Sequence, residues 1–132
     1  MTTSPLSAGL QACAAGIPTA EVGTGLLIAS GAFLHRGDFT GRFIHHGTCA
    51  SDGTTAMAAI NWDAAITALN AGELPCSGGE RRILRLAASL ADGIPVSLGD
   101  TVTGLDQCNS HHLIMAIRHA SDSGRLSMRA QC

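Results

Sequence analysis

Residues 75–86 read PCSGGERRILRL and contain the clearest helix start in the chain. Ser77 and Glu80 have the S-x-x-E spacing of a capping box, in which each side chain binds the backbone N–H group of the other residue. Behind the box, apolar residues recur at helical spacing: Ile83, Leu86, Ala87 and Leu90. Gly93 and Pro95 end this pattern, because both residues favour the end of a helix over its interior. The segment therefore predicts an amphipathic helix that packs one stripe into a core.

The same period recurs on both sides of this segment. The further stripes are Val22, Leu26, Ala29 and Phe33; Phe39 and Phe43; Trp62, Ala65, Ile66 and Leu69; and Leu113, Ile114, Ile117 and Ala120. Residues suited to an N-cap stand before helical runs: Asp38, Asn61, Ser97 and Asp106. Glycines stand where helices are expected to end: Gly16, Gly47, Gly72 and Gly124. Only residues 57–60 resemble a strand, so we predict an all-α fold, a compact bundle of five to seven short helices.

Length and composition predict one domain. The chain has 132 residues, of which 45% are hydrophobic and 14% are charged, which is enough apolar material for a folded core. We therefore expect a single helical domain over residues 1–132. The polar loop at residues 47–56 is the candidate sub-boundary, between a glycine-rich N-terminal part and a helical C-terminal part that share one core.

Composition also narrows the classes of function. The formal net charge is −2 at pH 7, which disfavours a surface built for nucleic acid. Residues 1–16 lack the basic residues of a signal peptide, and the apolar run at residues 22–34 is too short to cross a bilayer. Five scattered cysteines indicate free thiols and not a disulfide framework. The chain is therefore expected in the cytoplasm, without membrane contact.

The start of the helix at residue 78 also suggests a catalytic alternative. Cys76 and Arg82 have the C-x5-R spacing with which cysteine-dependent phosphatases hold phosphate. A helix N-terminus attracts anions and lowers the pKa of a thiol, and an arginine binds phosphate through two N–H groups. Against this, no strand leads into the loop, and Glu80 places a carboxylate beside it. Cys76 and Arg82 are thus candidate catalytic residues of a thiol enzyme, and a plain helix start is the competing interpretation.

Two Cys–His pairs suggest a metal alternative. His46 and Cys49 are three positions apart, and so are Cys108 and His111, in the opposite order. This is a spacing that structural zinc sites use, and two such pairs supply four tetrahedral ligands. The order of the ligands is not that of a familiar zinc finger. Zinc is therefore the candidate cofactor of a metal-stabilised module, and the alternative is that these are ordinary surface residues.

Arginines supply the candidate surface for a charged partner. Arg81, Arg82 and Arg85 lie mostly off the apolar stripe of their helix and form one candidate binding face. Residues 86–105 are also compatible with a helix-turn-helix, but the second helix, residues 98–105, carries Asp100 and no basic residue. A helical DNA-associated regulator is therefore kept as an alternative function.

Three segments carry a resemblance. They read LPCSGGE at residues 74–80, LRLAASLADGIPV at residues 84–96 and TGLD at residues 103–106. With these motifs the chain resembles small uncharacterised helical proteins of high-GC actinobacteria, most closely over residues 57–121. The group has no assigned activity, so the resemblance implies a lineage and no chemistry.

Taken together, the residues favour a non-enzymatic binding or interaction module of the cytoplasm. The expected surface for a protein partner, or for self-association, is the apolar helix near residues 18–34. Small residues in it, Gly23, Gly25 and Gly31, permit close helix packing. The alternative is that this helix fills the core of the monomer.

Overall fold

The computed structural model describes the backbone of residues 4–131 and the side chains of residues 4–122. Over this range the chain forms seven helices and one two-stranded sheet. In chain order these are α1 (Pro5–Ala14), α2 (Pro18–Ser30), α3 (Gly37–Phe43), β1 (Ile44–Thr48), β2 (Ala56–Ile60), α4 (Trp62–Asn70), α5 (Gly78–Asp92), α6 (Leu98–Val102) and α7 (Gln107–Gln131). The expected number of helices is confirmed, whereas the expectation of a purely all-α fold is wrong over residues 44–60.

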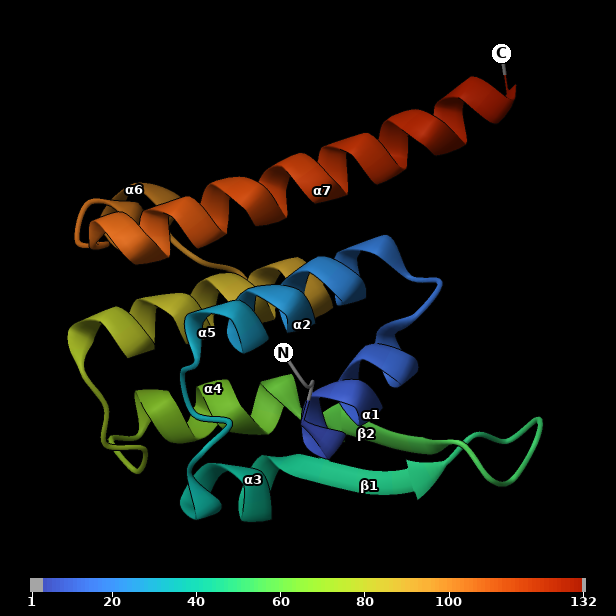
Figure 1. The fold of residues 1–132 in the computed structure, drawn as a ribbon. Coiled ribbons are helices and arrows are strands. Elements are labelled where there is room, and N and C mark those ends of the chain that lie inside the picture. The colour runs from blue at the N-terminus through green and yellow to red at the C-terminus, as the bar shows by residue number, and fades with distance from the viewer. Residues whose placement is uncertain (1–3, 132) are drawn as a thin grey trace.

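The helices form layers around a central pair. α2 and α5 lie together in the middle, and α7 covers α2 from one side (Figure 1). α4, α3 and the small sheet lie on the opposite side, and α1 packs against β2. Because α2 contacts α5, α7 and α1, it is the central element of the fold.

The core gathers around α2, α5 and the turn that leads into α3. Its largest fully buried side chains are Phe33, Phe39, Leu26, Leu27, Ile83 and Leu84. The rings of Phe33 and Phe39 have centroids 5.0 Å apart, and Phe39 and Phe43 continue the cluster at 5.2 Å. Phe33 has a left-handed backbone (φ 67°), which is rare for a bulky residue and costs backbone energy. Burial of its ring in the aromatic cluster offsets that cost.

Most of the predicted helix starts are confirmed by hydrogen bonds. In the capping box, the Glu80 N–H donates to Ser77 Oγ (3.1 Å) and the Ser77 N–H donates to Glu80 Oε1 (2.9 Å). Asn61 accepts from the Ala64 N–H at the start of α4. The side chain of Asp106 likewise accepts from the N–H of Asn109 before α7. The helix boundaries in this half of the chain thus follow from local chemistry.

Two predicted N-caps do not act as caps. Asp38 was expected to start a helix, but Arg36 occupies the N-cap position of α3, and Asp38 lies inside the first turn and pairs with Arg36. Ser97 does hold the N-cap position of α6, but its hydroxyl donates to the carboxylate of Asp100 and caps no backbone N–H. In both cases the side chain expected to cap the helix is bonded to another side chain.

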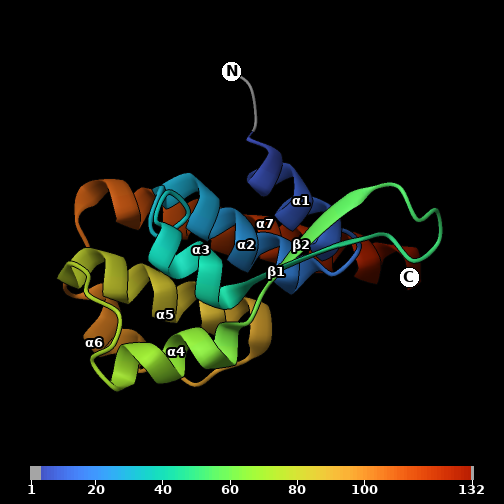
Figure 2. The same ribbon diagram turned by 90° about the horizontal axis from the view of Figure 1, so that it is seen from below.

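The helix expected to end at Gly47 stops at Phe43, and the chain continues as a strand. β1 and β2 pair antiparallel, with Ile44 opposite Ile60 and Thr48 opposite Ala56. They form a ribbon that projects from the helices (Figure 2). The 57–60 run that resembled a strand is therefore part of β2, and its partner β1 went unrecognised. The 47–56 loop is a hairpin whose ends, including Gly47, belong to the strands.

The last helix continues further than expected. Its predicted end near Gly124 is wrong, because α7 extends from Gln107 to Gln131. A glycine inside a helix costs only about 1 kcal/mol relative to alanine. The residues after it, including Arg125 and Leu126, favour helix. A lone glycine thus does not end a helix whose flanks favour continuation.

Candidate functional site

The arginine of the C-x5-R motif makes a structural contact. Nη1 of Arg82 donates to the carbonyl oxygen of Gly104 over 3.2 Å. The guanidinium lies so close to this turn that a Cβ on Gly104 would overlap it, and a Cβ on Gly78 would lie 3.0 Å from Nη1. Arg82 therefore joins the start of α5 to the turn before α7. This position gives Arg82 a role in the fold, which differs from the phosphate clamp that the motif suggested.

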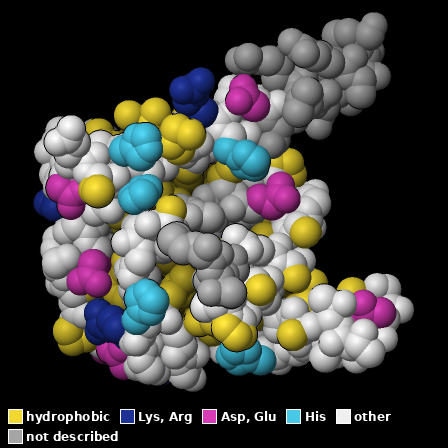
Figure 3. All heavy atoms as spheres, in the orientation of Figure 1, with side chains coloured by type: hydrophobic (Ala, Val, Ile, Leu, Met, Phe, Trp, Pro, Cys, Tyr) yellow, Lys and Arg dark blue, Asp and Glu magenta, His cyan; other side chains and the backbone are white. Residues whose placement is uncertain are grey.

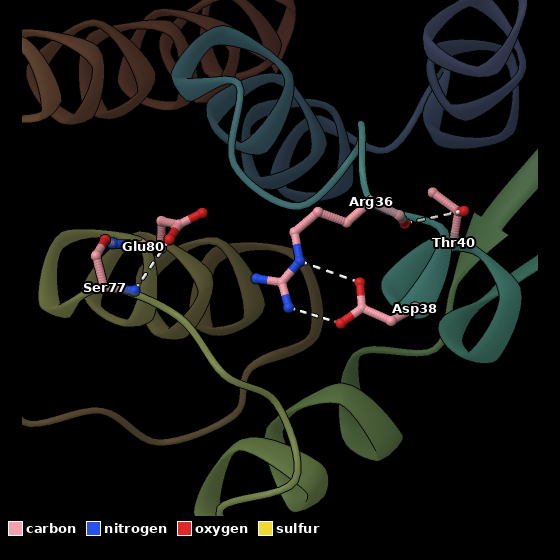
Figure 4. A network of polar contacts seen from close by, with 5 residues as sticks. All are labelled: Arg36, Asp38, Thr40, Ser77 and Glu80. Atoms are coloured by element: carbon pink, nitrogen blue, oxygen red, sulfur yellow. Dashed lines mark hydrogen bonds and ion pairs between the residues drawn. The ribbon is translucent and has the colours of Figure 1, made fainter.

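A different arginine approaches the start of α5. Arg36, in the turn between α2 and α3, pairs with both carboxylate oxygens of Asp38, from Nε at 3.0 Å and from Nη2 at 2.6 Å (Figure 4). Its guanidinium also lies 5.3 Å from the ring centroid of Phe33. The hydrogen bonds that Arg36 donates to Asp38 raise the pKa of Arg36, with smaller contributions from the charges of Asp38, Glu80 and Cys76. Sequence reasoning missed this residue, although the R-x-D spacing was the available signal.

The same pair shapes the carboxyl group. Hydrogen bonds from Arg36 lower the pKa of Asp38 below its ordinary value. The guanidinium of Arg36 is thereby bound to a carboxylate through two of its nitrogens. Cys76 itself is half-buried and packs against the hydrophobic core. The start of α5 is thus a packed corner of the fold, held by the capping box and by the bond from Arg82 to Gly104.

The arginine face of α5 is divided by these contacts. Arg81 is exposed and Arg85 is half-buried, while Arg82 is turned to Gly104. The segment read as the second helix of a helix-turn-helix contains only the five-residue α6, which includes Asp100. A short acidic helix offers few groups that read bases. The DNA-associated alternative therefore gains no support from this geometry.

The four candidate zinc ligands lie on separate elements. His46 is in β1 and Cys49 follows that strand, whereas Cys108 and His111 are in the first turns of α7. The hairpin and the start of α7 lie at opposite sides of the molecule in both ribbon views (Figures 1 and 2). Within residues 4–122, whose side chains the structure describes, no three His, Cys, Asp or Glu side chains are grouped to hold a metal ion. The chain as folded does not bring the two pairs together.

The hairpin tip holds one polarised thiol. Cys49 Sγ lies 3.0 Å from Ser51 Oγ, and this hydrogen bond lowers the pKa of the thiol. Asp52 orders the same tip by accepting from the Thr55 hydroxyl and from the N–H groups of Thr55 and Thr54. These bonds, the hydroxyl's above all, lower the pKa of Asp52 to about 2. The bonds account for the conformation of the tip by local turn chemistry.

The glycine-rich helix, expected to be the partner surface, is used inside the molecule. Val22, Leu26 and Leu27 of α2 are buried. Gly23 meets α5 so closely that a Cβ there would lie 2.6 Å from the carbonyl oxygen of Ala87. The alternative interpretation, that this helix fills the core, describes what the structure shows. A free surface must be sought on another element.

Exposed apolar side chains gather on α7. Five large hydrophobic residues are about half exposed in the described part of the chain, and three of them are Ile114 (55%), Met115 (49%) and Ile117 (49%). Hydrophobic and histidine side chains lie close together at the top of the face shown in Figure 3. The inner side of α7 packs onto α2 through Leu113 and Ala116. Sequence reasoning placed Ile114 and Ile117 on the inner stripe, which is wrong for both residues.

Comparison with known proteins adds no further assignment. No family model, curated protein or solved structure matches the chain significantly. The resemblance to small actinobacterial helical proteins therefore stays a prediction. In the part of the chain that the structure describes, no helix is both long and apolar enough to span a membrane.

Proposed function

We propose that this chain is a non-enzymatic interaction module of the cytoplasm that binds a protein partner through the outer face of α7. The outer face is defined by Ile114 and Ile117, which are one helical turn apart. The observation that carries the proposal is the exposure of both isoleucines, 55% and 49%, on a helix whose other side is already packed. Single exposed apolar residues are common, but two large ones aligned on one helix are typical of a contact surface.

A helical face of this kind suits a particular mode of binding. Isoleucines at i and i+3 form an apolar ridge that fits the groove of a partner helix pair or a hydrophobic cleft. Hydrophobic anchors at the centre of an interface carry most of the binding energy. The cytoplasmic setting is supported by the cysteines, because Cys13, Cys49, Cys76 and Cys108 are all unpaired.

The proposal is tested by comparing one double variant with one single control variant at similarly exposed positions. The variant Ile114→Ser/Ile117→Ser removes the ridge, and Ile17→Ser is the matched control, since Ile17 is 56% exposed in the connection between α1 and α2. Proteins captured by the wild-type chain are identified, purified and tested for direct binding by calorimetry. We expect the double variant to weaken binding at least about tenfold while Ile17→Ser leaves it unchanged. Equal binding by all three chains would contradict the assignment of this face.

A further inference from the structure

The side of α7 that faces α2 borders a groove with its own chemistry. The groove has a volume of about 270 Å³ and runs between Glu21, Gly25 and Ala29 of α2 and His112, Met115 and His119 of α7. This volume lies near the lower limit of ordinary small-molecule sites. Ile114 follows His112 by two positions, about 200° around the helix, so the groove and the outer face point in different directions.

The groove exists because α2 presents two small residues, Gly25 and Ala29, in line with Glu21. Glu21, Gly25 and Ala29 are spaced by four and therefore stack on one side of the helix. A Cβ added to Gly25 would meet no atom within 4 Å, so the missing side chain leaves open space. Buried Val22 and Leu26 supply the apolar floor. The groove is therefore a property of these particular residues, which a single larger side chain would fill.

One carboxylate lies at the end of this apolar groove. Glu21 is half-buried in the first turn of α2. Among the described residues, no hydrogen bond or ion pair reaches its carboxylate. A partly buried carboxylate without a partner favours a cation that also donates hydrogen bonds. Across the groove, the imidazoles of His112 and His119 offer further hydrogen-bonding groups, and the Met115 thioether packs well against flat apolar rings.

Metal ions fit this arrangement less well than an organic cation. Glu21 and the two histidines do not form a group that could hold a metal ion, as far as the described side chains extend. The floor is apolar, which favours a ligand with a hydrophobic body. Both features are satisfied by one molecule that joins a charged amino group to an apolar body, and a flat ring is the body that suits the Met115 thioether.

We propose that the α2–α7 groove is a binding site for a small aromatic amine, with the ammonium group on Glu21 and the ring over Leu26 and Met115. The ammonium donates to the Glu21 carboxylate, and the ring replaces water on the apolar floor. The site is independent of the proposed partner face, because Ile114 and Ile117 do not line it. No covalent step is involved.

The experiment compares ligands of the same body and different charge. Tryptamine, tryptophol and indole-3-propionate are titrated into the full chain by calorimetry at neutral pH. Variants are Glu21→Gln, which removes the charge, and Gly25→Leu, which fills the groove. Gly41→Leu is the control, because it adds the same side chain at another helical glycine where a Cβ meets open space. Circular dichroism verifies that each variant is folded.

We expect tryptamine to bind at least about tenfold more tightly than either of the other ligands, the usual contribution of a charged hydrogen bond. Glu21→Gln should remove this preference, Gly25→Leu should abolish binding, and Gly41→Leu should leave it unchanged. Equal affinity for the amine and the propionate would overturn the role of Glu21. Binding that survives Gly25→Leu would overturn the location, and a Kd for tryptamine weaker than about 1 mM would overturn the site itself.

Discussion

The two flanks of α2 face neighbouring helices, and each carries a glycine, but the two contacts differ. Toward α5, a Cβ on Gly23 would lie 2.6 Å from both the Ala87 carbonyl oxygen and the Ala91 Cβ. Toward α7, a Cβ on Gly25 would meet nothing within 4 Å. One glycine permits close contact between helices, whereas the other leaves a groove. The same residue type, two positions apart, therefore serves packing on one flank and leaves space on the other.

This difference explains which part of the molecule is available for binding. The α2–α5 contact is closed, because backbone atoms of α5 approach α2 directly and leave no space for a ligand. In the α2–α7 contact Leu113 and Ala116 are buried, but a groove opens where Gly25 and Ala29 lack bulk. α2 therefore packs closely against α5, which stabilises the core, and loosely against α7, which leaves a recess at the surface.

The largest effect is expected at the closed contact. Gly23→Ala places a methyl group where the neighbouring atoms are backbone and Ala91, which cannot move away as the end of a flexible side chain can. We expect the free energy of unfolding to fall by about 2–3 kcal/mol, the upper part of the range for overpacked cores. Urea denaturation followed by circular dichroism measures it. An unchanged midpoint would show that α2 and α5 pack less closely than described.

An intermediate effect is expected at Gly104, where the atoms next to an added Cβ belong to the Arg82 side chain and not to the backbone. The Cβ added by Gly104→Ala would overlap the Arg82 guanidinium. The guanidinium can move away, but it then loses its hydrogen bond to the Gly104 carbonyl oxygen. We expect a loss of about 1 kcal/mol of unfolding free energy, close to the value of one hydrogen bond. The same substitution in an Arg82→Ala background should cost almost nothing. Additive losses in this double-mutant cycle would contradict the proposed contact.

Helix starts could be predicted from the sequence because their causes are local. The Ser77–Glu80 box and the Asn61 cap each use residues within three positions, so their spacing alone identifies them. β1 could not be predicted in the same way. Its residues, Ile44 to Thr48, show no alternation, and they form a strand because Ile60 and its neighbours pair with them from beyond a turn. Pairing across the chain overrides local propensity there.

The candidate site shows the same limit more strongly. Spacing in the sequence grouped Cys76 with Arg82 and His46 with Cys49, but the contacts that define the groove and the start of α5 join residues far apart in the chain. Arg82 contacts Gly104, twenty-two positions away, and Glu21 shares a groove with His119 across the α2–α7 contact. Glu21 was not predicted as a site residue. Its neighbours in the sequence give no sign of the groove, because the other wall belongs to α7, about a hundred residues later.

The smallest effect is expected at the open flank, and its sign is reversed. Gly25→Ala adds a methyl group to empty space, so only helix propensity changes, and we expect a gain of about 0.5–1 kcal/mol in unfolding free energy. Urea denaturation of Gly25→Ala and Gly23→Ala under the same conditions measures the two unfolding free energies. A destabilising Gly25→Ala would mean that α7 lies closer to α2 than described, and no groove would then remain for a ligand. If the unfolding free energy falls for Gly23→Ala and rises for Gly25→Ala, the two flanks must differ, because the helix-propensity gain of alanine over glycine is the same at both positions.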